Sequence, residues 1–310
     1  MKKKKLNILI SCVGGLFIYD IIESLRKSDE FNLKIYGIDK DPFAYNKNLF
    51  DKFLKCPNAA NEKLFKKFFF KTIKTLKIDF FIPFSDTEAN FLIKYRGIIS
   101  ENFPNTKFSF DILNNNNNIF LNKELFYNFC NKNKINTFNY KIVNNLNKIS
   151  KIKNRQFVLK KSSSSGSRGI FLIDSKIKKP YEILKERDIY ISNFNYIKNK
   201  IDKSDYILMP YLNGQGYDVD CLSQNGKVVK MLIRKRMMYN KFMYYSPGHK
   251  IIKNKIIKKK ITQIIKLCKF SGITTFDIIK SKNSYNVIDM AARPSGSVAI
   301  GNLIGYNFII

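Results

Sequence analysis

The sequence predicts an α/β protein that begins with strand–helix–strand units and ends with antiparallel hairpins. In the first third, short apolar strands alternate with amphipathic helical segments, which is typical of a parallel sheet covered by helices. In the last third, strands of alternating polarity follow one another across short polar turns, which is typical of antiparallel pairing. With 310 residues, 45% of them hydrophobic, the chain has room for two or three small domains with apolar cores.

The first unit is a strand over residues 6–10, a turn at Gly14 and Gly15, a helix ending near Lys27 and a strand over 33–39. An acidic residue at the end of the second strand also fits a dinucleotide-binding fold. That fold needs a third glycine to bring the helix close to the strand, and this turn has only two. The pattern therefore argues against binding of NAD.

The second unit is a helix over residues 61–76 and a buried parallel strand over 78–84, after which Ser85 caps the next helix. The asparagine runs at 114–118 and 144–154 are low in complexity, and we expect both to be loops. Between them, residues 121–130 predict a short amphipathic helix.

Residues 156–173 form two apolar strands joined by a loop rich in serine and glycine. Small side chains leave backbone N–H groups and hydroxyls free to close over phosphate oxygens, and Lys160 adds a positive charge from the strand. No Gly-Lys-Ser/Thr opens a helix here, so this is not a Walker A loop. A flexible linker is the alternative, and the flanking strands favour the phosphate loop, whose central residues are Ser164, Ser165, Gly166 and Ser167.

Two neighbouring hairpin strands near the C-terminus contain Asp277 and Asp289. Carboxylates at these positions can point at one hard cation, with Arg293 just beyond to meet an anion. The alternative is that both carboxylates only cap turns.

Residues 228–236 have a period of two, so Arg234 and Arg236 share a face, either toward a substrate or phosphate or on an exposed basic edge strand. Asp218 and Asp220 are expected on the solvated face of their own strand. His249 is either a general base or a loop residue without a special role. Substrate specificity is expected in the loop over 239–249.

In the sequence and the order of their motifs, residues 120–310 resemble the ATP-grasp superfamily, of the kind found in the large subunit of carbamoyl-phosphate synthase. The resemblance rests on the two strands with Asp277 and Asp289, on the Ser/Gly loop, on the hinge-like stretch 206–222 and on Lys123. The family's Glu-x-Asn-x-Arg segment reads Asp289, Met290, Ala291, Ala292, Arg293 here, and Pro210 and Gly216 replace two usual glutamates of the hinge.

The resemblance implies a Rossmann-like pre-ATP-grasp domain over 1–112 and an ATP-grasp domain over 113–310, whose two α+β subdomains clamp the nucleotide. The lid subdomain would span about 150–208. The chain stops at Ile310 where the family continues through a helix, so we expect a shortened C-terminal part.

It further implies an ADP-forming ligase that uses Mg-ATP, or Mn²⁺ in place of Mg²⁺, to activate a small carboxylate as an acyl phosphate and join it to an amine. A phosphotransferase on the same fold and a non-catalytic nucleotide-binding relative remain alternatives. Asp277 and Asp289 would hold the metal, and Arg293 and Arg234 would act on the reacting groups. The nucleotide would be bound by Lys123, Lys160, Ser164, Ser165, Gly166, Ser167, Met209, Tyr211, Leu212 and Asp218.

The net charge of +32 raises nucleic acid as a partner. Only eight of the 56 basic residues are arginine, and the lysines are spread along the chain, which argues against a nucleic-acid groove. Five cysteines without CxxC spacing indicate reduced thiols of a cytoplasmic protein. No stretch has the 18 or so apolar residues of a membrane helix, so no membrane partner is expected. Oligomeric state stays open between a monomer and a homodimer.

Overall fold

The structure of the protein, a computed structural model, describes residues 3–15, 17–135, 138–143, 156–163, 168–185, 188–202, 204–237 and 248–309. Within these ranges the strands form three sheets, called here the first, second and third sheet in chain order. Three expectations lie outside the described residues: the loop at 144–154, the centre of the Ser/Gly loop at 164–167, and the residues from 239 to 247 in the expected specificity loop.

The first sheet is parallel and confirms the strand–helix–strand units expected from the sequence. Its strand order is β3-β2-β1-β4-β5, with helices between the strands. The strands β3 and β5 are too short to have been predicted. The elements are β1 (Lys4–Ser11), α1 (Ile18–Arg26), β2 (Phe31–Asp39), η1 (Lys47–Leu49), β3 (Lys52–Lys55), α2 (Glu62–Leu76), β4 (Phe80–Ile82), α3 (Asp86–Lys94), α4 (Arg96–Asn102) and β5 (Lys107–Phe108).

Two helices of this part, α2 and α3, begin at a residue whose side chain caps them. The Asn61 side chain accepts a hydrogen bond from the backbone N–H of Leu64. The Ser85 side chain accepts one from the backbone N–H of Glu88, and this cap is the one that the sequence predicts. In α2 the buried residues recur at helical spacing, so one face packs on the sheet: Phe65, Phe69, Thr72 and Ile73.

The asparagine run after the first sheet is not a loop, contrary to expectation. It forms the 3₁₀ helix η2 (Asn115–Phe120). Asn114 caps this turn, and the fully buried Asn117 donates a hydrogen bond to the carbonyl of Asp111 at 2.6 Å. Asparagine side-chain amides can hydrogen-bond the backbone groups of a tight turn, and composition alone does not predict these bonds. The helix α5 (Lys123–Lys132) follows, capped by Asn122.

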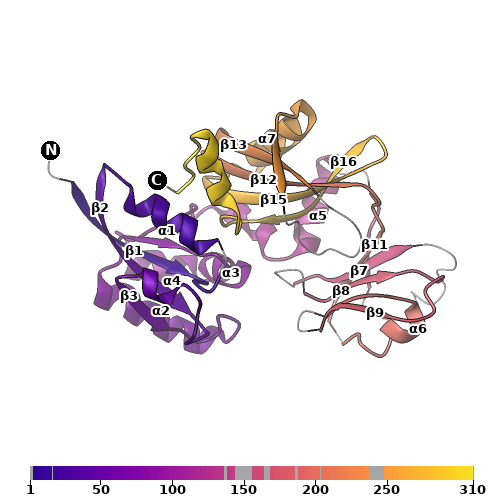
Figure 1. Ribbon diagram of the computed structural model, residues 1–310, viewed down its shortest axis with the longest axis horizontal. Coiled ribbons are helices and arrows are strands. Elements are labelled where there is room, and N and C mark those ends of the chain that lie inside the picture. The colour runs from indigo at the N-terminus through magenta and orange to yellow at the C-terminus, as the bar shows by residue number, and fades with distance from the viewer. Residues whose placement is uncertain are drawn as a thin grey trace.

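The second sheet has the order β6-β11-β7-β8-β10-β9 and lies in the lower right of Figure 1. The strands β7 and β8 pair antiparallel, as the Ser/Gly hairpin predicts, while residues 164–167 of its loop lie outside the described part. The elements are β6 (Lys141–Val143), β7 (Phe157–Lys161), β8 (Ile170–Ile173), β9 (Tyr181–Leu184), β10 (Ile189–Ser192), α6 (Phe194–Ile197) and β11 (Tyr206–Pro210).

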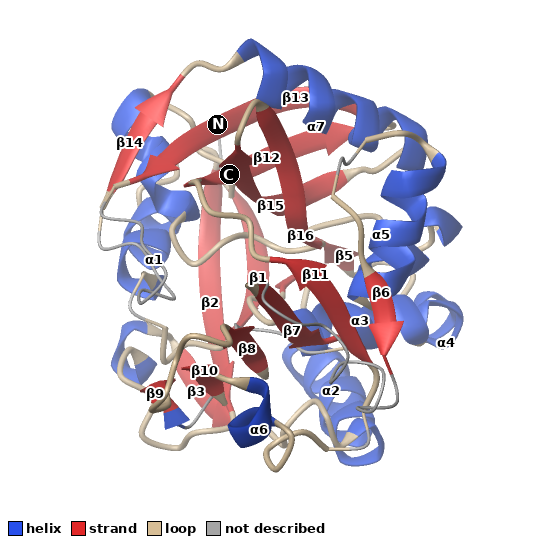
Figure 2. Cartoon of the chain, turned by 90° about the vertical axis from the view of Figure 1, so that its right-hand side faces the viewer, coloured by secondary structure: helices blue, strands red, loops and turns tan. Residues whose placement is uncertain are grey.

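The third sheet is antiparallel, with the order β14-β13-β12-β15-β16. Its apolar face packs against a helix, α7, whose buried residues are Ile257, Ile261, Ile264, Ile265 and Cys268. Figure 2 shows α7 and α5 beside this sheet. The elements are β12 (Gln215–Gln224), β13 (Lys227–Arg236), β14 (His249–Ile252), α7 (Lys255–Cys268), β15 (Gly272–Ser281), β16 (Ser284–Ala291) and η5 (Val298–Ile304).

The first and third sheets meet at a close backbone contact. Phe110, just after β5, forms an isolated antiparallel bridge with Gly272 at the start of β15. Figure 1 shows the first sheet with its helices on one side of the molecule and the other two sheets on the other side.

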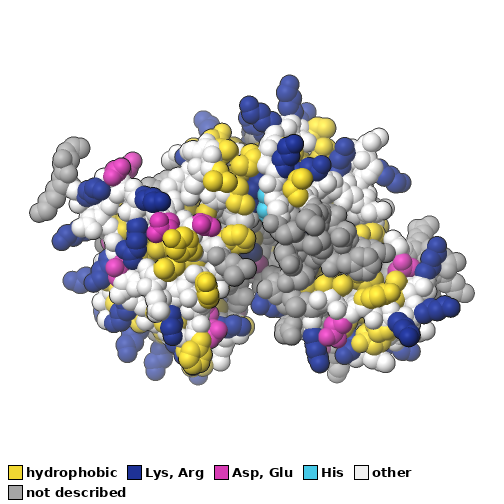
Figure 3. Space-filling model, viewed as in Figure 1, with side chains coloured by type: hydrophobic (Ala, Val, Ile, Leu, Met, Phe, Trp, Pro, Cys, Tyr) yellow, Lys and Arg dark blue, Asp and Glu magenta, His cyan; other side chains and the backbone are white. Residues whose placement is uncertain are grey.

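None of the described helices has the length and apolarity to cross a membrane. Among the cysteines, all five are free thiols, and all but Cys12 are buried. On the face shown in Figure 3, lysine and arginine side chains are spread over all parts of the molecule instead of gathering in one groove.

Candidate active site

One face of the third sheet presents charged side chains, called here the charged face. Cross-strand partners in a sheet point to the same side, and the register places Arg234 opposite Asp218 and Asp218 opposite Asp277. Asp277 in turn lies opposite Asp289, and Arg236 lies opposite His249. These residues line a cavity of about 1060 Å³ between the third sheet and the N-terminal part of the chain.

A β-bulge in β16 makes the two carboxylates face each other. Asp277 pairs with Asp289, but the next pair is Ile278 with Val287, so Ile288 is an extra residue without a cross-strand partner. In a regular hairpin Asp277 would lie opposite Ile288, and Asp289 would point to the other face. The bulge therefore produces the juxtaposition of Asp277 and Asp289 that the sequence predicts.

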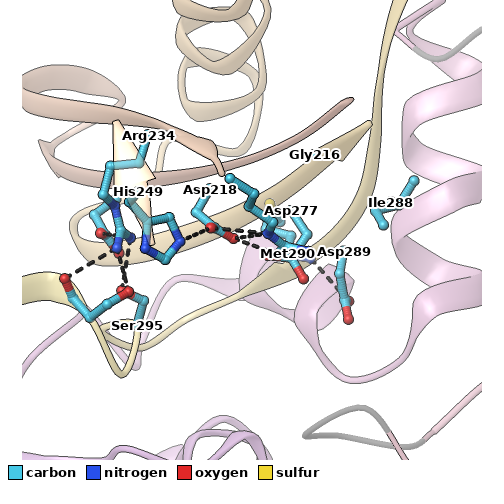
Figure 4. Close-up of polar contacts among 12 residues, drawn as sticks. Gly216, Asp218, Arg234, His249, Asp277, Ile288, Asp289, Met290 and Ser295 are labelled. Atoms are coloured by element: carbon cyan, nitrogen blue, oxygen red, sulfur yellow. Dashed lines mark hydrogen bonds and ion pairs between the residues drawn. The ribbon is translucent and has the colours of Figure 1, made fainter. Parts of the chain in front are cut away.

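Four hydrogen-bonded side chains form a continuous row across β14, β13, β12 and β15, and Figure 4 labels three of them, His249, Asp218 and Asp277. The Nε2 atom of His249 lies 2.7 Å from Oδ2 of Asp218. The guanidinium of Arg236 donates to both oxygens of Asp218 and, at 3.0 Å, to Oδ1 of Asp277. Asp218 is thus a paired, largely buried carboxylate, and the expectation of a solvated face is wrong for it.

The two carboxylates of this row, Asp218 and Asp277, differ in their affinity for protons. Burial opposes ionisation of Asp218, but the hydrogen bond to His249 and the charge of Arg236 outweigh it and lower the pKa of Asp218. Burial, together with the neighbouring Asp218 and Asp289 carboxylates, raises the pKa of Asp277 to about 7, although Arg236 opposes this. About two fifths of the Asp277 and Asp289 side chains (43% and 41%) remains exposed, so both carboxylates face the cavity.

Two lysines approach the Asp289 end of the cavity. The Nζ atom of Lys123 lies 3.4 Å from Oδ2 of Asp289. Lys160 reaches across from β7 and donates to the carbonyl of Ile288 at 2.9 Å. Burial lowers the pKa of Lys160 to about 8, although Asp289 opposes this. The two candidate phosphate-binding lysines therefore lie beside the candidate metal ligands.

Arg234 lies in a buried corner of the same face. It pairs with the buried Asp220, and donates to Ser295 Oγ at 3.1 Å and to the Ser297 carbonyl at 3.2 Å. Its side chain is 0% exposed and β13 has neighbours on both sides, so the exposed edge strand is excluded. The expectation of a solvated Asp220 is wrong as well. In this structure Arg234 Nε and Asp220 Oδ1 have no partner within the described residues.

Arg293 contacts the N-terminal part of the chain. Its guanidinium forms a two-pronged ion pair with Asp86 in the first turn of α3, with Nη2 3.2 Å from Oδ2. Burial opposes the charge, but the Asp86 carboxylate raises the pKa of Arg293, so the group stays cationic. Asn90 and Lys94 of α3 also line the cavity, which is therefore bounded by both sides of the molecule.

The remaining predicted site residues either lie outside the described part or do not line the cavity. Ser164, Ser165, Gly166 and Ser167 lie outside the described part, while the adjoining Ser162 and Ser163 line the cavity. Met209 and Leu212 are buried near the end of β11 and, with Tyr211, are not among the described lining residues.

Three contacts were not foreseen from the sequence: His249 with Asp218, Arg236 with Asp277, and Asp86 with Arg293. His249 begins β14 and is not a loop residue. The shared face of Arg234 and Arg236 was the one usable signal, because the other contacts depend on strands and sheets that are remote in sequence.

Residues 202–310 match a family model described as ATP-grasp in the biosynthetic pathway with Ter operon. A search of curated proteins by sequence finds no match.

Solved structures match nearly the whole chain. L-amino acid ligase from Bacillus licheniformis has 15% identity and a TM-score of 0.69, with 99% of this chain and 73% of that chain covered. D-alanine–D-alanine ligase from Bacillus anthracis has 13% identity and a TM-score of 0.62, with 98% and 93% covered. The biotin carboxylase domain of 2-oxoglutarate carboxylase from Hydrogenobacter thermophilus has 12% identity and a TM-score of 0.66, with 98% and 70% covered. The chain therefore has the ATP-grasp fold, and its C-terminal third matches an ATP-grasp family by sequence.

Proposed function

We propose that the protein is a ligase that uses Mg-ATP to activate a small-molecule carboxylate as an acyl phosphate and then joins it to an amine. The observation that supports this most is the charged face, where Asp277 and Asp289 face a cavity next to Lys123. Both carboxylates lie inside the segment that matches the ATP-grasp family. Relatives of this fold have been solved with ATP and with the magnesium salt of ADP, which supports the choice of nucleotide.

The carboxylates at the cavity are the type of ligand that magnesium prefers, but the described residues supply fewer ligands than a complete magnesium site has. Carboxylate oxygens are the hard ligands that Mg²⁺ and Mn²⁺ prefer. The described residues contain no group of three His, Cys, Asp or Glu placed to hold a metal ion, and Ala291 has no ligand atom. Mg²⁺ keeps several waters and shares nucleotide oxygens, so Asp277 and Asp289 alone would be a sufficient protein contribution.

The other residues would bind and orient the reacting groups. Lys123, Lys160 and the Ser/Gly loop would hold phosphate oxygens, and the hinge at Met209, Tyr211 and Leu212 would meet the base. Arg293 would face the charge that develops as phosphate is transferred, with Arg234 in the buried corner to meet an anionic group. In the reaction, ATP supplies its γ-phosphoryl group to the carboxylate. The amine then attacks the acyl carbon, and phosphate leaves as the amine loses a proton.

The domain boundaries proposed are 1–112 and 113–310, with a lid at about 150–208. A cytoplasmic location and small-molecule substrates complete the proposal.

A non-catalytic nucleotide-binding relative is the second candidate. Arg236 already contacts Asp277 and Lys123 already contacts Asp289, so the chain's own cations neutralise both carboxylates. A metal ion would have to compete with them.

Nucleotide binding and turnover separate these candidates. Lys160→Ala should weaken ATP binding by about 2–3 kcal/mol, the loss typical of a charge-assisted hydrogen bond. The matched control is Lys161→Ala, because Lys161 is the next residue on β7 and pairs with Asp202. Release of ADP that requires both a carboxylate and an amine supports the ligase. Turnover without the amine favours a phosphotransferase, and binding without turnover favours the non-catalytic relative.

A further inference from the structure

The carbonyl group of Ile288 is a junction between α5, β7 and β16. The Tyr127 hydroxyl of α5 donates to it at 2.6 Å, and Lys160 Nζ of β7 donates to it at 2.9 Å. Lys160 Nζ also lies 5.1 Å from the centre of the Tyr127 ring. Tyr127 therefore contacts Lys160 through its ring and shares a hydrogen-bond acceptor with it.

The β-bulge explains why this carbonyl is available. Ile288 is the extra residue of β16 and has no cross-strand partner in the ladder. A buried carbonyl outside the ladder must find donors elsewhere, because an unpaired one costs free energy. Tyr127 and Lys160 supply them, one residue before Asp289.

Tyr127 is suited to remain a neutral donor. Its side chain is 1% exposed, and burial raises its pKa, with the Asp289 charge adding to the effect. The aromatic face stabilises the buried ammonium of Lys160 through a cation–π contact. The Tyr127 hydroxyl therefore donates to the carbonyl that Lys160 also contacts, while the Tyr127 ring contacts the Lys160 ammonium itself.

The helix of Tyr127 also contacts the two other parts of the candidate nucleotide site. Lys123 precedes Tyr127 by four residues, hence on the same helix face, and lies 3.4 Å from Asp289. The backbone N–H of Lys123 donates to the carbonyl of Ser162, at the start of the Ser/Gly loop, at 3.0 Å. Through Lys123, α5 thus contacts both Ser162 at the start of the Ser/Gly loop and the β15–β16 hairpin.

We propose that Tyr127 is a positioning residue of the nucleotide site: its ring and hydroxyl hold Lys160 beside the Ile288 carbonyl, and the hydroxyl keeps that carbonyl hydrogen-bonded when the ammonium turns to a nucleotide phosphate. The proposal rests on the proposed function, since it needs Lys160 to meet phosphate.

The physical reason is a difference between the free and the bound protein. Without nucleotide the carbonyl has two donors, so loss of the Tyr127 hydroxyl leaves it paired with Lys160. With nucleotide bound, Lys160 has turned away, and in Tyr127→Phe the buried carbonyl has no donor. An unpaired buried group of this kind should weaken binding about tenfold.

A double-mutant cycle with a non-hydrolysable ATP analogue and Mg²⁺, measured by calorimetry, tests the proposal. Tyr127→Phe should weaken binding about tenfold in the unmodified background and leave it unchanged in a Lys160→Ala background, because the carbonyl then has the same partners before and after binding. Tyr140→Phe is the matched control. Tyr140 lies beside Tyr127, but its hydroxyl donates to Asn128, so affinity should not change. Equal losses in both backgrounds would mean that Tyr127 is only structural and would overturn the proposal.

Labelling of Lys160 by an amine-reactive reagent, read by peptide mass spectrometry without nucleotide, separates the junction from the nucleotide function. Tyr127→Leu removes the ring that stabilises the ammonium, so Lys160 should react about threefold faster at neutral pH. An unchanged labelling rate contradicts the junction whether or not nucleotide binds. Failure of the unmodified protein to bind the analogue contradicts the proposed function and, with it, the role of Tyr127 in nucleotide binding.

Discussion

Glu88 is a buried carboxyl group of the N-terminal part, on α3. Its oxygens accept a hydrogen bond from Ser11 and lie 3.8 Å from the sulfur of Cys12. Burial raises the pKa of Glu88 to about 7, although the Ser11 hydrogen bond opposes the rise. At this residue the fold favours the protonated form.

A pH-dependent stability follows from this shift. The folded-state pKa of about 7 lies above the unfolded value of 4.5, so the contribution of Glu88 to stability is fully present below pH 4.5 and is lost as the pH rises through 7. Replacement by glutamine keeps an acceptor for Ser11 and removes the titration. The loss of unfolding free energy between pH 4.5 and 8 should therefore be smaller in Glu88→Gln by about 3 kcal/mol.

Urea unfolding at a series of pH values measures this difference. The control is Glu101→Gln, because Glu101 is exposed and its replacement should leave the pH profile as it is. If the profiles of the unmodified protein and Glu88→Gln coincide, Glu88 does not hold its proton in the folded state.

Asp277 and Asp289 are the residues on which turnover should depend most. Asp277→Asn or Asp289→Asn should lower ATP turnover at least about hundredfold, because an amide cannot replace the charge that holds the cation. Ala291→Asn adds a ligand atom beside Asp289 and should lower the magnesium concentration needed for half-maximal rate.

Steady-state turnover across a magnesium titration checks both effects. Asp29→Asn, at a fully exposed surface carboxylate, is the control and should have no effect. Normal turnover by Asp289→Asn would show that Asp289 does not hold the metal ion.

The charged residues show how far the sequence predicts a site. Asp277 and Asp289 could be predicted as neighbours because they lie on the two strands of one hairpin, but their facing geometry depends on the bulge at Ile288, which no residue pattern announces. His249 could not be placed, since its partner Asp218 lies 31 residues away across a strand pairing. Strand registers between distant segments are set by tertiary packing.

Among the elements, Gly272 at the start of β15 makes a close contact between the first and third sheets. Its φ of +120° is rare for residues with a side chain. A Cβ atom at this position would lie 2.3 Å from Cα of Phe110 and 2.4 Å from the carbonyl oxygen of Ser109. Both neighbours are backbone atoms of the chain that leaves the first sheet, so they cannot move aside without shifting it.

Gly272→Ala should therefore lower the free energy of unfolding by about 2 kcal/mol or more, as forced overpacking does. Gly97→Ala is the matched control, because an added Cβ there meets nothing within 4 Å and the residue lies in α4. The control should be neutral or stabilising by about 0.5 kcal/mol. Equal stability of Gly272→Ala and the unmodified protein in urea would show that the two sheets do not approach this closely.

The elements themselves were predicted better than their contacts. The helix α2 follows from apolar spacing and α3 from its cap at Ser85, both of which are local signals. The 3₁₀ helix at Asn115–Phe120 was missed because the prediction of a loop used only the asparagine-rich composition. The helix depends on a specific hydrogen bond, from the buried Asn117 side chain to the carbonyl of Asp111.

For the whole molecule, the cavity is bounded by parts that are far apart in sequence. The ion pair of Asp86 with Arg293 joins α3 to the segment after β16 across 207 residues. The family resemblance predicted two domains around a nucleotide, but the sequence alone does not show that the cavity reaches α3. The proposed reaction would bring its carboxylate and its amine together in this cavity, beside the charged face.

Transfer of ¹⁸O from the carboxylate substrate into phosphate tests the central claim most directly. The protein would be incubated with Mg-ATP, amino acids or sugar acids labelled with ¹⁸O in the carboxyl group, and an amine, and the released phosphate would be analysed by mass spectrometry. Activation as an acyl phosphate predicts one labelled oxygen per phosphate, with no label released by Asp289→Asn. Phosphate whose new oxygen comes only from water, or no release of phosphate with any carboxylate tested, would contradict the account.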